Sequence, residues 1–133
     1  MQLNWNKSMN KTILKTIPSP SFTHNDDSEA SPIVRIEKIK PFINICKVTG
    51  EKEEMNIEIT YVPKDKIIEL GSYREFFEQG FNDYVEKLAM DFFNILDETI
   101  RPHQLSVKVY LDEKTLTPWS VTLNTNEGWS YNR

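Results

Sequence analysis

The feature that most constrains the fold of this chain is a pair of adjacent helix patterns between two pairs of strand patterns. The first is SYREFFEQGF, residues 72–81, and the second is DYVEKLAMDFFNILDETI, residues 83–100. Apolar residues in the second recur at the spacing of a helix that lies on a sheet. Gly80 separates the two patterns and Pro102 ends the second. Two consecutive helices argue against the β-α-β alternation of a parallel sheet.

Four strand patterns flank the helices. Two precede them, IVRIEKIKPFINI at residues 33–45 and MNIEITYVP at residues 55–63, and two follow, QLSVKVYL at residues 104–111 and WSVTL at residues 119–123. Their alternation is typical of antiparallel strands with one solvated face. The order therefore predicts an α+β fold of β-β-α-α-β-β type, with a four-stranded antiparallel sheet and both helices on one face.

The N-terminal residues differ in composition from the rest. The stretch IPSPSFTHNDDSEASP, residues 17–32, is rich in Ser, Pro and Asp and contains one aromatic residue. Such a segment cannot bury enough apolar surface to order itself. We predict a disordered tail at residues 1–31, which contains His24, and a single domain at residues 32–133.

Several classes of protein are disfavoured by simple counts. No run reaches the roughly 18 apolar residues of a membrane span, and the N-terminus lacks the apolar centre of a signal peptide. One cysteine and two histidines give neither a disulfide nor a zinc-ligand spacing. A net charge of −4 does not favour attraction of the whole molecule to nucleic acid. We expect a reduced, cytoplasmic protein without a metal.

Each helix pattern also opens with the spacing of a capping box. Ser72 is followed three residues later by Glu75, and Asp83 is followed by Glu86 at the same distance. In this motif the two side chains bind backbone N–H groups of the first helical turn. The spacing predicts helix starts at Ser72 and Asp83.

The stretch CKVTGEKE, residues 46–53, carries a more specific signal. It resembles the segment Cys-Pro-x-Thr-Gly-x-x-Asp, followed by a strand ending in Tyr-x-Pro, of the QueF-like nitrile reductases. These tunnelling-fold enzymes use NADPH to convert 7-cyano-7-deazaguanine to its aminomethyl form in queuosine biosynthesis, a tRNA modification pathway. Five residues are in register with that pattern: Cys46, Thr49, Gly50, Tyr61 and Pro63. Glu53 stands at the aspartate position and Lys47 replaces the proline.

Two further signatures of that family are matched in part. ELGSYREFF, residues 69–77, resembles a segment that is linked to NADPH, although Arg74 replaces one lysine and Gly71 replaces another. YVE, residues 84–86, aligns with Phe-His-Glu and keeps Glu86, but Val85 stands where the family has histidine. The resemblance covers roughly residues 33–111, and the C-terminal signatures of the reductases are absent.

The resemblance implies a role for each of these residues. Cys46 would add to the nitrile carbon to give a covalent thioimide, with Glu53 as the nearby acid. The substrate would be bound by Glu86, Glu69 and Ser72, and NADPH by Ser72 and Arg74. The fold family also implies a cyclic homo-oligomer with ligand sites between subunits, and no metal or membrane.

Purely structural interpretations remain open at this level. Cys46 could be a small, half-buried residue at a strand end, and Glu53 could be one carboxylate of a solvated acidic run. Glu86 and Ser72 could serve only as helix caps, and Arg74 could lie on a solvated helix face. His103, which follows Pro102 at a helix end, does not look catalytic.

Three functions are therefore compared, and we expect the first, with the other two as alternatives. The first is an NADPH-dependent nitrile reductase, which the segment from Glu69 to Phe76 favours. The second is an archaeosine-type amidinotransferase that adds ammonia to the same nitrile on tRNA, which the missing C-terminal signatures favour. The third is a non-catalytic purine- or pterin-binding relative, which the departures at Lys47, Gly71 and Val85 favour.

Overall fold

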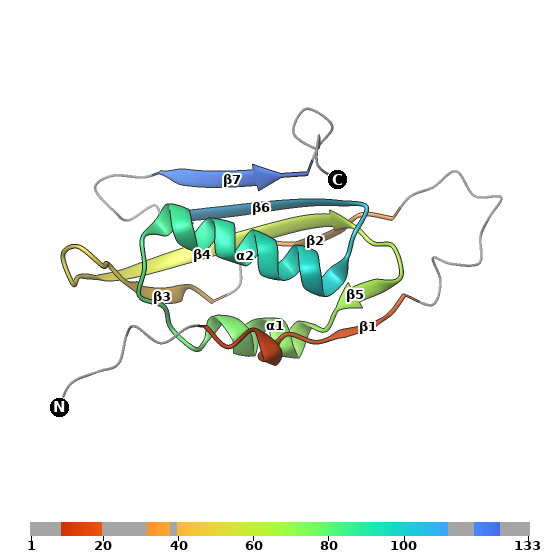
Figure 1. Ribbon diagram of the computed structural model, residues 1–133, viewed down its shortest axis with the longest axis horizontal. Helices are drawn as coiled ribbons and strands as arrows, with labels where there is room; N and C mark the ends of the chain where they lie inside the picture. The colour runs from red at the N-terminus through yellow and green to blue at the C-terminus, as the bar shows by residue number, and fades with distance from the viewer. Residues whose placement is uncertain (1–8, 20–31, 38–39, 112–118, 126–133) are drawn as a thin grey trace.

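A computed structural model describes residues 9–19, 32–37, 40–111 and 119–125. Its main sheet has the neighbour order β2–β4–β6–β7, with β3 also paired to β4, and every pairing is antiparallel (Figure 1). The strands are β2 (Val34–Ile36), β3 (Phe42–Ile45), β4 (Lys52–Val62), β6 (Gln104–Leu111) and β7 (Ser120–Asn124). The predicted α+β class and antiparallel sheet are confirmed.

The first edge of the sheet differs from the prediction. A continuous strand was expected over residues 33–45, but β2 pairs with the C-terminal part of β4 and β3 pairs with its N-terminal part. Pro41 directly precedes β3, and proline has no N–H group to donate to a strand ladder. The five strands therefore occupy the four predicted positions, because β2 and β3 share one edge of β4.

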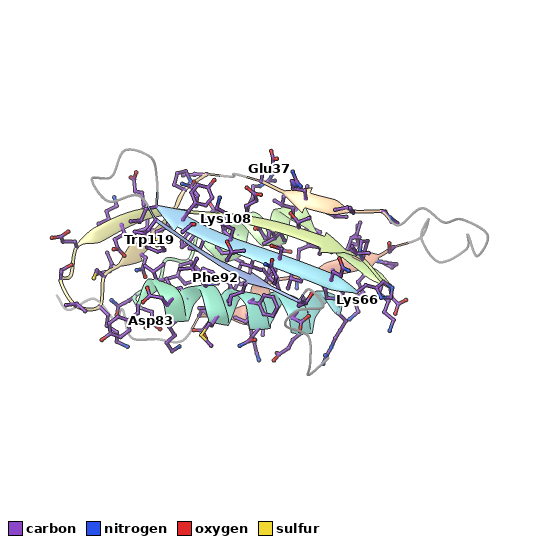
Figure 2. All side chains as sticks on the ribbon, turned by 90° about the horizontal axis from the view of Figure 1, so that it is seen from above. Glu37, Lys66, Asp83, Phe92, Lys108 and Trp119 are labelled. Atoms are coloured by element: carbon purple, nitrogen blue, oxygen red, sulfur yellow. The ribbon has the colours of Figure 1, made fainter. Side chains whose placement is uncertain are left out.

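Both helices pack on the same face of the sheet, as predicted. These are α1 (Leu70–Phe77) and α2 (Val85–Ile100). The ring of Phe42 in β3 lies 5.4 Å from that of Phe77 in α1 and 5.6 Å from that of Phe92 in α2. Phe92 points from α2 toward the sheet, whereas Lys108 lies on the opposite side of the sheet (Figure 2).

The core is a cluster of aromatic rings between the helices and the sheet. Phe92 is completely buried and its ring lies 5.0 Å from that of Phe81 and 5.1 Å from that of Phe77. Truncating such a residue to alanine typically costs about 3–5 kcal/mol of stability. Gly80 has a φ of 78°, a conformation that glycine adopts without strain, and it reverses the chain between the two helices.

The predicted disordered tail is wrong for residues 9–19, which we call the N-terminal arm. The arm contains a short 3-10 helix, η1 (Lys11–Ile13), and a strand, β1 (Thr16–Pro18), that pairs antiparallel with β5 (Lys66–Ile68). Leu14 is buried in the core between them. The polar composition of residues 17–32 does not reveal this arm. Its anchors are the buried Leu14, the partly buried Met9 and Ile13, and the pairing of β1 with β5. The remainder of the predicted tail lies outside the described residues.

No helix within the described ranges is long and apolar enough to cross a membrane.

Candidate functional site

Cys46 lies at the start of the loop that joins β3 to β4. Its backbone N–H donates to the carbonyl of Glu51 at 2.8 Å, and its own carbonyl accepts from the N–H of Gly50 at 2.8 Å. Gly50 has a φ of 75°, which favours glycine at this point of the turn. The side chain of Cys46 is a free thiol that is half-buried. A closed loop with a half-exposed sulfur suits a nucleophile better than a core spacer.

The loop favours the ionised form of this thiol. The pKa of Cys46 is lowered first by a hydrogen bond with the side chain of Thr49, and then by the backbone N–H groups of Thr49 and Val48. Partial burial and the negative charge of Glu53 act in the opposite direction and raise the pKa of Cys46. Since the thiolate is the reactive form of cysteine, the loop increases the fraction of Cys46 that is in the reactive form at a given pH.

Glu53 is the one glutamate of its acidic run that turns inward. Glu51 and Glu54 are exposed, whereas Glu53 is half-buried. Its Oε1 accepts a hydrogen bond of 2.8 Å from Nδ2 of Asn44, the residue opposite it on β3. The structure thus brings Glu53 close enough to Cys46 to influence the thiol electrostatically, and its role in proton transfer remains a prediction.

The start of α2 is attached directly to this hairpin. Asn44 donates to the carbonyl of Asp83 at 3.0 Å and accepts from its N–H at 3.1 Å. Asn82 donates from its side chain to the carbonyl of Ile45 at 3.0 Å. Nζ of Lys47 lies 3.9 Å from Oδ1 of Asp83. The cysteine loop and the first turn of α2 therefore form one unit.

Glu86 projects from the first turn of α2 and makes no capping bond there. The predicted capping box of Asp83 and Glu86 is wrong, because α2 begins at Val85 and its N-cap is Tyr84, which makes no side-chain cap bond. Asp83 instead accepts from the N–H of Tyr84 at 2.8 Å. Glu86 is exposed, and no hydrogen bond or ion pair joins it to another residue in the described part of the chain. Its carboxylate is available to a ligand.

The start of α1 is arranged differently from the predicted capping box of Ser72 and Glu75. Glu69 is the N-cap, and its carboxylate accepts from the N–H groups of Gly71 at 2.7 Å and Ser72 at 2.8 Å. These N–H groups, Gly71 first, hold the pKa of Glu69 below its ordinary value. The hydroxyl of Ser72 is buried and accepts from the N–H of Lys15 in the arm at 2.9 Å. Glu69 and Ser72 therefore bind each other and the arm.

Figure 1 places this closed helix start next to β5, at the opposite end of α1 from the β3–β4 hairpin and the start of α2. Glu69 and Ser72 are consequently not brought together with Cys46, Glu53 and Glu86 within one chain. The predicted site residues fall into two groups, one beside Cys46 and one at the start of α1.

Arg74 is exposed and lines a cavity of about 290 Å³ between β3 and α1. The cavity is formed by Lys40, Pro41, Phe42, Ile43, Arg74, Phe77 and Glu78. Ser72 does not line it. Of the two residues expected to bind NADPH, Ser72 is covered by the arm, whereas Arg74 is exposed. The N-cap carboxylate of Glu69 adds a negative charge beside Ser72. Among the described ranges, no group of three or more His, Cys, Asp or Glu residues could hold a metal ion.

Asn44 is the site residue that the sequence interpretation missed. It shares a strand face with Phe42 and is completely buried. The signal was a polar residue at a core-facing position of FINIC, since a buried amide must find hydrogen-bond partners.

Comparison with known proteins supports the fold. No family model and no curated protein matches the chain. Among solved structures, an archaeosine synthase QueF-Like in the apo form superposes with a TM-score of 0.62 at 16% identity, covering 71% of this chain and 95% of that one. A protein assigned as a dihydroneopterin aldolase (FolB) from Vibrio cholerae O1 gives a TM-score of 0.53 at 13% identity, covering 71% and 97%. The chain has the tunnelling fold.

Proposed function

We propose that this chain is a thiol-dependent enzyme that converts the nitrile of 7-cyano-7-deazaguanine, carried on tRNA, to an amidine with ammonia. The observation that carries this proposal is the half-exposed thiol of Cys46, with its pKa lowered by Thr49 and with Glu53 beside it. The solved archaeosine synthase of the same fold supports this choice over reduction.

The first step forms a bond between the sulfur of Cys46 and the nitrile carbon. One π bond of the nitrile breaks, and its nitrogen takes the proton that the thiol loses, with Glu53 carrying this proton from sulfur to nitrogen. The product is a thioimide that needs neither an oxidant nor a reductant. Oε1 of Glu53 is held by Asn44, so the carboxylate stays in place during the transfer.

In the second step ammonia adds to the thioimide carbon and expels the thiol of Cys46. The nitrogen of ammonia forms the new C–N bond as the C–S bond breaks, and the released proton returns to sulfur. The product is an amidine. Glu86 anchors the deazapurine by accepting hydrogen bonds from its ring N–H and amino groups, as a charged acceptor does more strongly than a neutral one.

Assembly completes the site in this proposal. β7 ends the sheet on one side, and β2 with β3 forms the other edge in the described part of the chain. Open edges of this kind pair with other strands. We expect a cyclic homo-oligomer with each site between two subunits, and sedimentation that shows only monomer at micromolar concentration would contradict this part of the proposal.

An NADPH-dependent reductase is the second candidate. It is favoured by Arg74, whose guanidinium is exposed at the cavity next to Lys40 and could meet a phosphate. It is disfavoured by the closed start of α1. A non-catalytic ligand-binding relative would have the same fold and would form no covalent adduct.

These candidates differ in the reagent, ammonia or NADPH, that converts the thioimide to product. Purified protein is incubated with the nitrile, as free base and on tRNA, and then receives NADPH or ammonium, with products identified by mass. We expect an amidine with ammonium and no oxidation of NADPH. Oxidation of NADPH in step with amine formation would establish a reductase and overturn the proposal, and the absence of any product would support a ligand-binding protein.

A further inference from the structure

Asn44 is a completely buried polar residue at the junction of three segments. Its Nδ2 donates to Oε1 of Glu53 at 2.8 Å and to the carbonyl of Asp83 at 3.0 Å. Its Oδ1 accepts from the N–H of Asp83 at 3.1 Å. A primary amide has two N–H donors and one carbonyl acceptor, so every hydrogen-bonding group of Asn44 is used, and each bond reaches another segment.

These contacts are specific to an amide. The two bonds to Asp83 imitate a backbone strand partner, and they continue the bridge that residues Asn44 and Phe81 make between β3 and the loop before α2. The third bond reaches Glu53. A hydrophobic residue would fill the space beside Phe42 but would leave the partly buried N–H and carbonyl groups of Asp83 without these partners, which is destabilising.

We propose that Asn44 is a positioning residue for Glu53, a role that rests on the proposed function. Asn44 fixes Oε1 of the carboxylate and so leaves Oε2 as the oxygen that exchanges the proton between sulfur and nitrogen. Through Asp83 the same side chain ties this carboxylate to the start of α2, which carries Glu86. The amide of Asn44 thereby contacts both the proton-transfer group and the segment that leads to the substrate anchor.

The first test measures the rate of thioimide formation with the free nitrile base and no reductant. Asn44→Ser should slow it by about 10-fold or more, since misplacing a catalytic group by about 1 Å can cost on the order of 100-fold. Asn82→Ser is the matched control, because Asn82 joins the same hairpin to the same loop through Ile45 without touching Glu53. It should change the rate by less than about 2-fold.

The decisive comparison is made in the background of Glu53→Gln. If Asn44 acts through Glu53, adding Asn44→Ser to Glu53→Gln should slow the reaction by less than about 2-fold further, because the effects of residues that act as a unit are not additive. If the double variant is slower by the product of the two separate factors, Asn44 has only a structural role. If Asn44→Ser does not yield folded protein, Asn44→Asp keeps the size, removes the donor to Glu53, and is compared in the same way.

A second readout needs no nitrile. Alkylation of Cys46 by iodoacetamide is followed against pH, and its midpoint reports the pKa of the thiol. Since the charge of Glu53 raises the pKa of Cys46, Glu53→Gln should lower the midpoint. Asn44→Ser, which releases that carboxylate, should shift the midpoint from that of the wild type, and the double variant should match Glu53→Gln. Asn82→Ser should leave the midpoint unchanged.

The two measurements distinguish failure of the proposed function from failure of the inference about Asn44. If the wild type forms no thioimide, the proposed function fails, and the alkylation midpoint still decides the role of Asn44. If Asn44→Ser has the midpoint of the wild type while Glu53→Gln shifts it, Asn44 does not position Glu53 and the inference is overturned.

Discussion

The two helices of this chain begin in opposite ways. At the start of α1, Glu69 caps the free N–H groups and the arm covers Ser72 through Lys15. At the start of α2, the N-cap Tyr84 offers no side-chain bond, Glu86 is exposed, and the loop of Cys46 lies alongside. One helix start is closed by the chain itself, and the other remains available to a ligand.

This difference shows that a family motif at a helix start does not by itself mark a ligand-binding site. A helix N-terminus attracts negative charge, and at α1 the carboxylate of Glu69 already provides it. The resemblance to the reductase family assigned ligand-binding residues to both helix starts, because it compares residues by position in the sequence. Of the two helix starts, that of α2 carries an exposed carboxylate and is attached through Asp83 to the hairpin of Cys46. The geometry therefore favours chemistry that does not depend on the start of α1.

The largest effect on stability should come from removing the part of the N-terminal arm that covers the start of α1. Deleting residues 1–15 removes the buried side chain of Leu14 and the partner of Ser72, and should lower the free energy of unfolding by about 3 kcal/mol or more. Urea denaturation measures this change, with deletion of residues 1–8 as the reference. Equal stability of the two truncated proteins would mean that the arm does not hold the start of α1.

A charge change at the open start should affect ligand binding much more than folding. Glu86→Gln keeps the size of the side chain and should weaken binding of a guanine-like ligand by about 10-fold or more, since hydrogen bonds to charged groups contribute about 1.5–3 kcal/mol. Calorimetry in the background of Cys46→Ala avoids covalent capture. Glu98→Gln, also on α2, is the control, and an equal loss of affinity in both variants would remove Glu86 from the site.

The same Glu→Gln change at Glu69, at the start of α1, should affect folding and not ligand binding. The pKa of Glu69 is lowered, so its carboxylate stabilises the fold above the ordinary glutamate pKa, and this stabilisation is lost as the pH falls through the lowered folded value. Glu69→Gln should therefore be less stable than the wild type at neutral pH, by a difference that shrinks on acidification. Thermal unfolding over a pH series measures it, and a difference independent of pH would contradict the cap.

The smallest effect concerns the thiol itself. The side chain of Thr49 lowers the pKa of Cys46, so Thr49→Val should raise this pKa and move the midpoint of iodoacetamide alkylation to higher pH. Thr122→Val, at an exposed position on β7, is the control. A midpoint that moves to lower pH, or does not move, would show that the loop does not activate Cys46.

Much of the fold could be predicted because burial repeats with a regular period. The alternation of Met55, Ile57, Ile59 and Tyr61 marked β4, and QLSVKVYL coincides with β6. Gly80 and the residues around Pro102 ended the helices as expected, with Arg101 in the left-handed conformation.

Features that depend on single partners could not be predicted. A capping box was assigned by spacing at Ser72 and at Asp83, yet the cap of α1 is Glu69 and that of α2 is Tyr84. The choice among nearby polar residues depends on where the arm and the hairpin pack. The inward turn of Glu53 likewise depends on Asn44, a contact between two strands that no local pattern reveals.

The account depends most directly on whether Cys46 is a nucleophile that acts without a cofactor. Purified protein is mixed with 7-cyano-7-deazaguanine, as free base and on tRNA, in the absence of NADPH and analysed by intact mass and peptide mapping. We expect a gain of one ligand mass per subunit on the peptide that contains Cys46, and no gain in Cys46→Ala. The free energy of unfolding of Cys46→Ala should lie within about 1–2 kcal/mol of that of the wild type. No gain in the wild type, or an equal gain in Cys46→Ala, would contradict the account.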